Sequence, residues 1–246
     1  MTALILQGRL DSSRLPGKSL RDLGGAPLLF RVMEALNRVP CDLRILACPE
    51  DCEDSFLPLA RRAGFELTTG PKDDVLGRFC AALRRYKPAR VIRATGDNPF
   101  VFADASAVLA GEAAALDADY SGYARLPWGA GVEALKAAAL FRAEQDAAEP
   151  SEREHVCPYL YNHPERFRVH RPPAPEKWLD PLLAENRTTR LSVDTAEDLE
   201  TANVLYAALT EEYGGGDERF LGENIIRVYQ KRFFPEISSV RTGVLS

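Results

Sequence analysis

The feature that most constrains the fold is a regular alternation of short apolar segments with longer amphipathic ones. Residues 4–6, 43–48, 65–68 and 89–95 are short apolar runs typical of buried strands. Between the first two, residues 28–39 carry apolar side chains at helical spacing. Strands that alternate with helices build βαβ units, in which helices cover both faces of a parallel sheet. We therefore predict an α/β fold with a mostly parallel, Rossmann-like sheet.

The second half of the chain is less regular. We predict a helix over residues 151–162, a strand over residues 190–193, and a further helix that begins at the capping box Thr195–Asp198. These elements predict one domain that spans the whole chain. Within it we expect an inserted segment at about 120–175 for the acceptor or a dimer contact, and a helical C-terminal tail at about 214–246.

Composition excludes several classes of protein. Of the 246 residues, 46% are hydrophobic and 27% are charged, which is ordinary for a globular protein with one large core. The net charge of −5 argues against a general nucleic-acid binder. No apolar run approaches the roughly 20 residues of a membrane helix, and no secretory signal opens the chain. The five cysteines form no CxxC pair, so we expect reduced thiols in a cytoplasmic protein without a zinc site.

The loop after the first predicted strand gathers cationic and small polar side chains. They are Arg9, Ser12, Ser13, Arg14, Gly17 and Lys18. Such a loop at the carboxyl end of a parallel strand suits a polyphosphate, because N–H groups, hydroxyls and fixed cations converge on anionic oxygens. A solvated basic loop without a ligand is the alternative. A Walker A loop is disfavoured, because Pro16 lacks an N–H group and Gly24 follows where a long helix belongs.

Five blocks of sequence, in order along nearly the whole chain, carry a resemblance to a known family. They are residues 7–20, 73–79, 93–99, 152–159 and 190–199. The first, Gln-Gly-Arg-Leu-Asp-Ser-Ser-Arg-Leu-Pro-Gly-Lys-Ser-Leu, closely resembles the signature loop of the cytidylyltransferases, which include the acylneuraminate and 3-deoxy-manno-octulosonate enzymes. The nearest resemblance is to the branch of spore-coat polysaccharide biosynthesis protein F. It implies a nucleotidyltransferase with a GT-A-like fold.

The resemblance also implies a reaction and a set of residues. CMP would pass from CTP to an acidic or other surface-polysaccharide sugar, with Mg²⁺ as cofactor, release of pyrophosphate, and a homodimer as the assembly. The implied catalytic residues are Arg9, Lys18, Asp97 and Asp194. The implied nucleotide-binding residues are Gln7, Gly8, Arg9, Ser13, Arg14, Lys18, Arg78 and Thr95. Arg78 is equally well interpreted as a surface arginine of a helix.

Asp97 and Asp194 each follow a predicted strand. The carboxyl ends of parallel strands meet at one edge of a sheet, so we expect both carboxylates within a few ångströms of a common point that faces the loop. Two carboxylates beside a triphosphate suit Mg²⁺, and the resemblance implies that both aspartates bind it. By position alone, Asp97 is equally a turn residue, and Asp194 a residue near a helix dipole.

Three further residues are candidates for binding the sugar acceptor. Glu133 lies in a segment, residues 127–133, that resembles the acceptor segment of the family. His155 and Tyr159 are four positions apart, so a continuous helix would place them on one face. Structural hydrogen bonds within a half-buried helix are the alternative for this pair.

The chain departs from the branch at three positions: Asp11 replaces glycine, Gly8 replaces alanine and Asn98 replaces cysteine. Two other functions stay open. A nucleotide-sugar-dependent glycosyltransferase usually carries an Asp-x-Asp at a strand end, whereas Asp117-Ala-Asp119 precedes a predicted strand. A non-catalytic nucleotide-binding protein is the second alternative.

Overall fold

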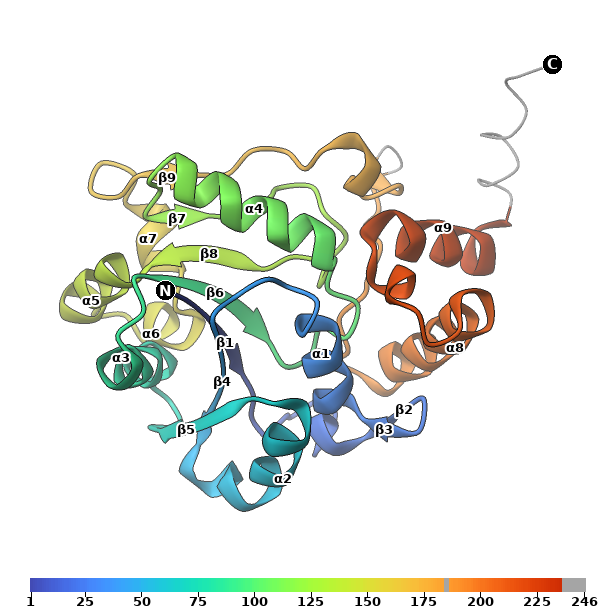
Figure 1. Cartoon of the computed structure of the whole chain (residues 1–246), viewed down its shortest axis with the longest axis horizontal. Helices are drawn as coiled ribbons and strands as arrows, with labels where there is room; N and C mark the ends of the chain where they lie inside the picture. The colour runs from blue at the N-terminus through green and yellow to red at the C-terminus, as the bar shows by residue number, and fades with distance from the viewer. Residues whose placement is uncertain (184–185, 236–246) are drawn as a thin grey trace.

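The computed structural model describes residues 1–183 and 186–235 of the chain. Its main sheet has seven strands in the order β5-β4-β1-β6-β8-β7-β9 (Figure 1). The bounds are β1 (Thr2–Gln7), β4 (Leu43–Pro49), β5 (Glu66–Gly70), β6 (Arg90–Thr95), β7 (Tyr120–Ser121), β8 (Glu133–Lys136) and β9 (Val169–His170). β5, β4, β1 and β6 pair in parallel, and β8 runs antiparallel to both of its neighbours. The predicted α/β fold with a mostly parallel sheet is confirmed.

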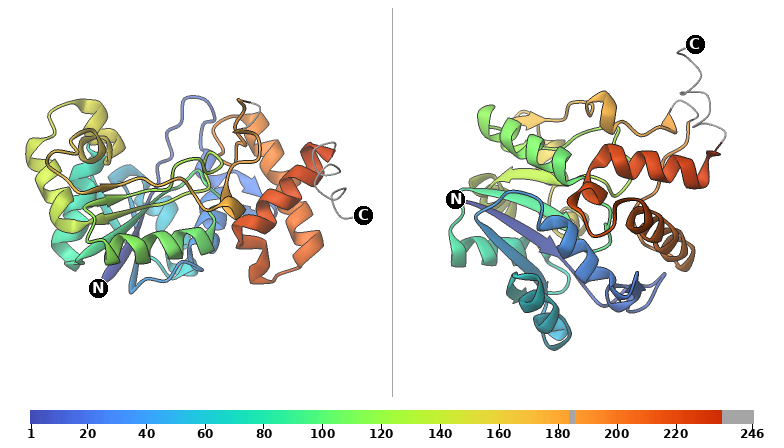
Figure 2. Two further views of the ribbon diagram at one scale, coloured as in Figure 1. Left: turned by 90° about the horizontal axis from the view of Figure 1, so that it is seen from above. Right: turned by 45° about the vertical axis from the view of Figure 1, so that its right-hand side comes forward.

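Helices cover both faces of this sheet. They are α1 (Leu28–Leu36), α2 (Glu53–Ala63), α3 (Val75–Tyr86), α4 (Ala103–Ala115), α5 (Ala137–Asp146), α6 (Pro150–His155), α7 (Pro158–Asn162), α8 (Ala196–Tyr213) and α9 (Gly222–Phe233). One face packs against α3, α5 and α7, and the other packs against α1, α2 and α4. Seen from above, α4 and α5 lie on opposite sides of the sheet (Figure 2).

The apolar run of β1 explains this arrangement. Successive side chains of a strand point to opposite faces, so Ala3 and Ile5 enter one core while Leu4 and Leu6 enter the other. All four side chains are fully buried. Burial on both faces requires apolar residues at every position, which is why the first strand is a continuous apolar run.

A third core joins the C-terminal helices to the end of the sheet. α8 and α9 lie side by side in Figure 1, and their apolar residues pack with Leu15, Leu23 and Leu28 from the N-terminal region. The short strands β2 (Asp22–Leu23) and β3 (Ala26–Pro27) and the 3-10 helices η1 (Lys18–Leu20), η2 (Glu50–Cys52), η3 (Glu176–Trp178) and η5 (Asp217–Phe220) complete the fold. The predicted tail is helical in α9, and residues 236–246 lie outside the described part.

Two predicted elements are wrong in detail. Residues 151–162 form two short helices, because Pro158 cannot donate the hydrogen bond that would continue α6 and Val156 turns the chain with a φ of 69°. Residues 190–193 form only an isolated bridge, in which Arg190 pairs with Trp128. The segment nevertheless runs beside the sheet edge, because the Val193 N–H group donates to the carbonyl of Asp97 at 2.8 Å.

The segment at 120–175, predicted as an insertion, contributes three strands to the same sheet, β7, β8 and β9, and three helices, α5, α6 and α7. That this segment binds the acceptor or forms a dimer contact stays a prediction. Within residues 1–183 and 186–235, no helix is long and apolar enough to span a bilayer.

Candidate active site

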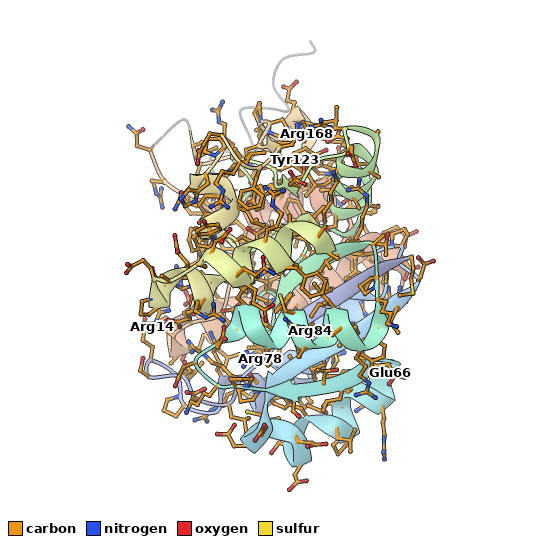
Figure 3. The ribbon with its side chains drawn as sticks, turned by 90° about the vertical axis from the view of Figure 1, so that its left-hand side faces the viewer. Arg14, Glu66, Arg78, Arg84, Tyr123 and Arg168 are labelled. Carbon is orange, nitrogen blue, oxygen red and sulfur yellow. The ribbon has the colours of Figure 1, made fainter. Side chains whose placement is uncertain are left out.

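A cavity of about 550 Å³ opens at the carboxyl ends of β1 and β6. Its walls come from the loop after β1, the first turns of α3, the loop after β6, residues 128–131, the end of α6 and residues 192–194. Figure 3 shows Arg14 at this edge of the molecule and Glu66, which begins β5, toward the opposite edge. The cavity therefore lies where open α/β sheets bind their ligands.

Most of the residues predicted from the sequence line this cavity. They are Gln7, Gly8, Arg9, Ser13, Arg14, Lys18, Arg78, Thr95, Asp97, His155 and Asp194. Glu133 and Tyr159 are not among the lining residues.

Lys18 holds the two predicted aspartates together. Gly17, with a φ of +66°, turns the chain into η1, and the Lys18 side chain then runs inward with only 9% of the residue exposed. Its Nζ donates to Asp97 Oδ2 at 3.2 Å, to Asp194 Oδ1 at 3.0 Å and to the carbonyl of Val193 at 3.1 Å. These three acceptors match the three protons of an ammonium group. The two carboxylates thus meet at one point at the edge of the sheet, as predicted, although residues 190–193 reach it without forming a strand of the sheet.

Arginines also contact Asp194. Arg14 approaches Asp194 Oδ1 at 3.0 Å from the exposed loop, and Arg190 contacts Oδ2 at 2.5 Å. Arg190 also contacts Asp198, whose side chain caps α8 by accepting from the N–H groups of Asp194 and Thr195. The capping box at the start of α8, predicted from the sequence, is present. The same Asp198 carboxylate accepts from the N–H group of Asp194, and this hydrogen bond holds the backbone from which the Asp194 side chain projects.

The aspartate pair fits one kind of magnesium site. Mg²⁺ is commonly bound by one or two carboxylates together with phosphate oxygens and water. Asp97 and Asp194 offer two carboxylates at one point, and in the described part of the chain no cluster of three acidic, His or Cys side chains forms a metal site. The pair therefore fits an ion held mainly by nucleotide phosphates, which would share both carboxylates with Lys18 and the Asp194 carboxylate with Arg14 and Arg190. That these residues bind Mg²⁺ stays a prediction.

Of the two interpretations of Arg78, the surface arginine is wrong, and its role in nucleotide binding stays a prediction. Arg78 is 2% exposed, and its guanidinium donates to the carbonyl of Pro71 at 2.6 Å. Burial lowers the pKa of Arg78, and its Nε is buried without a hydrogen-bond partner among the described residues. In Figure 3 it lies below α3, on the side of β5. A buried guanidinium in the cavity wall is a positive charge that water screens poorly.

Glu133 is occupied by a network behind the cavity. Its carboxylate forms an ion pair with Arg93 and accepts hydrogen bonds from the hydroxyl of Tyr120 at 2.9 Å and the thiol of Cys157 at 3.1 Å. Burial alone would lower the pKa of Arg93, but the Glu133 carboxylate outweighs it and raises that pKa. Arg93 in turn donates to Gln7 Oε1 at 3.1 and 2.9 Å. Glu133 thus reaches the cavity only through Arg93 and Gln7.

His155 and Tyr159 do not share a helix face, because the chain turns at Val156 between α6 and α7. His155 ends α6 and lines the cavity. Tyr159 is buried, its ring lies 4.3 Å from that of His163, and its hydroxyl accepts from Arg166. The placement of Tyr159 supports the structural alternative for this residue.

The negative charge that Asp11 adds to the cationic loop after β1 is neutralised by a neighbouring lysine. Its carboxylate contacts Lys72 Nζ at 2.9 Å. Although burial raises the pKa of Asp11, the Lys72 ammonium lowers it more, so the pKa lies below its usual value. Arg9 in the same loop contacts Glu154 at 3.4 Å, with both side chains about half exposed. Arg9 therefore stays accessible to a ligand in the cavity.

Sequence reasoning gave no role to Glu154 or Ser192, which line the cavity. Trp128 and Arg93 also line it, and the sequence named only the segments that contain them, residues 127–133 and 93–95. Trp128 had a signal, because it is a large aromatic residue between Pro127 and Gly129 in a loop without helical or strand periodicity. Ser192 had none, since a serine within the predicted strand 190–193 belongs to no motif of its own.

Comparisons with known proteins agree with this geometry. A family model described as cytidylyltransferase matches residues 3–237. Spore coat polysaccharide biosynthesis protein SpsF of Bacillus subtilis (strain 168) is 34% identical over 209 residues, which cover 82% of this chain and 85% of the relative. A 3-deoxy-manno-octulosonate cytidylyltransferase of Anaeromyxobacter dehalogenans (strain 2CP-1) is 34% identical over 102 residues, which cover 40% of this chain and 41% of the relative.

Solved structures share the fold. A cytidylyltransferase from Leptospira borgpetersenii serovar Hardjo-bovis superposes with a TM-score of 0.82 at 22% identity, covering 96% of this chain and 95% of that one. A CMP:2-keto-3-deoxy-manno-octonic acid synthetase complexed with CTP gives a TM-score of 0.63 at 17% identity, with coverages of 84% and 98%. The family model matches nearly the whole chain and the SpsF relative most of it. The chain therefore belongs to the cytidylyltransferase family of enzymes.

Proposed function

We propose that this enzyme transfers CMP from CTP to a sugar of a surface polysaccharide, in a Mg²⁺-dependent reaction that releases pyrophosphate. One observation carries the proposal. Asp97 and Asp194 converge on Lys18 at the carboxyl edge of the sheet, directly beneath a loop with two accessible arginines, Arg9 and Arg14. The names of the relatives, a polysaccharide biosynthesis protein and a 3-deoxy-manno-octulosonate cytidylyltransferase, support the same class of substrate.

The reaction requires positioning and charge neutralisation. A sugar oxygen attacks the α-phosphorus of CTP and loses its proton to water, while the bond from that phosphorus to the bridging oxygen breaks and pyrophosphate leaves with the electron pair. Arg9 and Arg14 neutralise the outer phosphates, and Ser13 orients them. Lys18 holds the two carboxylates in place and places a fixed cation near the departing charge. A Mg²⁺ ion bound by Asp97 and Asp194 would supply further neutralisation at the phosphates.

The nucleoside end of CTP is assigned to the root of the loop. Gly8 follows β1 and lines the cavity, and its N–H group donates to the carbonyl of Ala47 at 3.2 Å. Gln7 stands beside it with its amide oxygen held by Arg93. Thr95 lines the same cavity, and Arg78 adds a buried positive charge. His155 is the remaining predicted acceptor-binding residue in the cavity wall.

The glycosyltransferase alternative is less favoured. Asp117 contacts Lys136 at 2.7 Å and Arg90 at 3.2 Å, and Asp119 accepts from the backbone of Arg168. Neither aspartate lines the cavity. Both aspartates form ion pairs or hydrogen bonds with residues near β7 and β8. Asp117-Ala-Asp119 is therefore not a metal site beside the loop after β1. The cationic loop occurs together with Asp97 and Asp194, the two predicted metal-binding carboxylates. A protein that only binds nucleotide would not require this complete set, so we disfavour that alternative.

A pyrophosphate-release assay tests the function. Each of CTP, UTP, ATP and GTP is offered with a panel of acid sugars that includes 3-deoxy-manno-octulosonate and N-acetylneuraminate. We expect release with CTP and Mg²⁺, and loss of the Mg²⁺-dependent rate in Asp97→Asn with an unchanged circular dichroism spectrum. Sugar transfer from a nucleotide sugar without pyrophosphate release would support the glycosyltransferase alternative. Binding of CTP without turnover by any sugar would support the non-catalytic one.

We also propose that the enzyme is a cytoplasmic homodimer that binds no nucleic acid. Light scattering of the purified chain measures the assembly, and a single species at the monomer mass would contradict it.

A further inference from the structure

Trp128 exposes an unusual amount of apolar surface for a residue in a cavity wall. It is 62% exposed and lines the cavity, whereas the chain's other tryptophan, Trp178, is 1% exposed. A tryptophan normally buries most of its ring in a core or an interface. An exposed ring in a cavity wall is a surface available to a ligand.

The backbone around Trp128 is fixed. Its N–H group donates to the carbonyl of Thr189 at 2.8 Å, and its carbonyl accepts from Leu191 at 2.8 Å. The next residue, Gly129, has a φ of +91°, and a Cβ atom there would lie 2.7 Å from the backbone nitrogen of Ser192. The loop is thus packed tightly against residues 189–192. A ring on a fixed backbone loses little freedom when it binds a ligand.

The position of Trp128 places it next to the reacting centre. The Cβ position of Gly129 is also 3.0 Å from Asn98 Oδ1, and Asn98 directly follows Asp97. Ser192 precedes Asp194 by two residues, and its hydroxyl is buried without a hydrogen-bond partner among the described residues. The neighbourhood of Trp128 therefore combines an exposed aromatic ring with two polar residues of the cavity wall, Asn98 and Ser192.

This combination matches the two kinds of surface on a sugar ring. One face of a pyranose carries C–H bonds, which are attracted to the electron-rich face of an aromatic ring, while its hydroxyls exchange hydrogen bonds with polar side chains. A nucleobase also stacks on tryptophan. In the proposed function the base lies at Gln7 and Gly8, at the root of the loop after β1. Trp128 instead adjoins the residues beside Asp97 and Asp194, where the new bond would form.

We propose that Trp128 is the platform on which the acceptor sugar rests during CMP transfer. The proposal rests on the proposed function. Within the segment 127–133, which resembles the acceptor segment of the family, it assigns the contact to the Trp128 ring in place of Glu133. It also explains how the site binds an acceptor although Glu133 and Tyr159, two residues predicted for that task, lie outside the cavity lining.

Tryptophan fluorescence tests the position of the ring. Acrylamide quenches the exposed Trp128 and spares the buried Trp178, and subtraction of the Trp128→Phe variant isolates the Trp128 signal. CTP, 3-deoxy-manno-octulosonate and N-acetylneuraminate serve as probes, singly and in combination, with EDTA to prevent turnover. We expect a sugar acid in the presence of CTP to lower the quenching constant, and CTP alone to leave it unchanged. Shielding by CTP alone, or no shielding by either sugar acid, overturns the proposal.

Kinetics with the panel provide the second readout. Trp128→Ala should raise KM for the sugar about tenfold, the factor that corresponds to roughly 1.4 kcal/mol, and leave KM for CTP unchanged. Trp128→Phe keeps a flat ring and should retain most of the affinity. If wild-type enzyme turns over and Trp128→Ala matches it, the platform is wrong while the proposed function stands. If wild-type enzyme releases no pyrophosphate with any sugar, the proposed function fails, and the quenching result still decides whether a sugar covers Trp128.

Discussion

Single residues decide how charge is balanced in the active site. Lys18 neutralises two carboxylates that would otherwise repel each other across the cavity. We expect Lys18→Ala to slow pyrophosphate release about a hundredfold, because loss of one preorganised charged contact costs on the order of 3 kcal/mol in the transition state. Lys18→Arg is the matched control that keeps the charge and changes its shape. A wild-type rate in purified, folded Lys18→Ala would refute the assignment.

Glu133 contributes to the stability of the fold through its ion pair with Arg93, which gives a prediction about the free energy of unfolding. Glu133→Ala removes the carboxylate that pairs with the Arg93 guanidinium, whose side chain is 11% exposed, and breaking a largely buried pair in this way costs about 3 kcal/mol of unfolding free energy. Urea unfolding measures it. Glu154→Ala, at a half-exposed position, should cost less than about 0.5 kcal/mol. A raised KM for the sugar with unchanged stability in Glu133→Ala would instead restore its predicted role as a ligand to the acceptor.

At the scale of elements, the start of α8 links a helix cap to the active site. Burial raises the pKa of Asp198, but hydrogen bonds from the backbone of Asp194 and Thr195 and the charge of Arg190 lower it more, so the pKa lies below its usual value of 3.8. A lowered pKa means that the ionised form stabilises the fold. That stabilisation is present above the unfolded pKa and is lost as pH falls through the folded one.

Asp198→Asn tests this linkage. The variant should be less stable than wild type at neutral pH, and the difference should shrink as pH falls below about 4, where the wild-type carboxylate is also protonated. Urea unfolding across that pH range measures it. Thr195→Ala removes an uncharged cap and should cost about 1 kcal/mol at every pH. A pH-independent difference for Asp198→Asn would show that its charge does not matter.

At the scale of the whole molecule, the cavity joins distant parts of the chain. Gln7, Asp97 and Asp194 line it together. A ligand that contacts all three regions stabilises the fold as a unit. With CTP and Mg²⁺ at about 100 times Kd, binding adds about 2.7 kcal/mol, which should raise Tm by roughly 5–10 °C. Calorimetry measures the shift. Asp97→Asn should lose the part of it that requires Mg²⁺, and an equal shift with GTP would contradict recognition of cytosine.

Much of this protein was predictable from its sequence because the signals are local. The apolar run of β1, the capping box of α8 and the cationic loop after β1 each occupy a short stretch in which spacing fixes conformation. The order of strands and helices then fixes which strand ends share an edge. The convergence of Asp97 and Asp194 was predicted in this way, although residues 190–193 form no strand of the sheet and reach its edge through the hydrogen bond from Val193 to Asp97.

Other features were decided only by tertiary structure. The three protons of Lys18 are donated to residues 79, 175 and 176 positions away, and no local pattern encodes such a meeting. Arg78 is buried and Glu133 is drawn into a network with Arg93, because packing from other elements determines which face of an element is covered and which charges lie within reach. The sequence by itself determined the alternating strands and helices of the first half of the chain and the edge of the sheet at which the cavity opens. Only the packed fold determined which side chains face the cavity, because that depends on contacts between segments far apart in the chain.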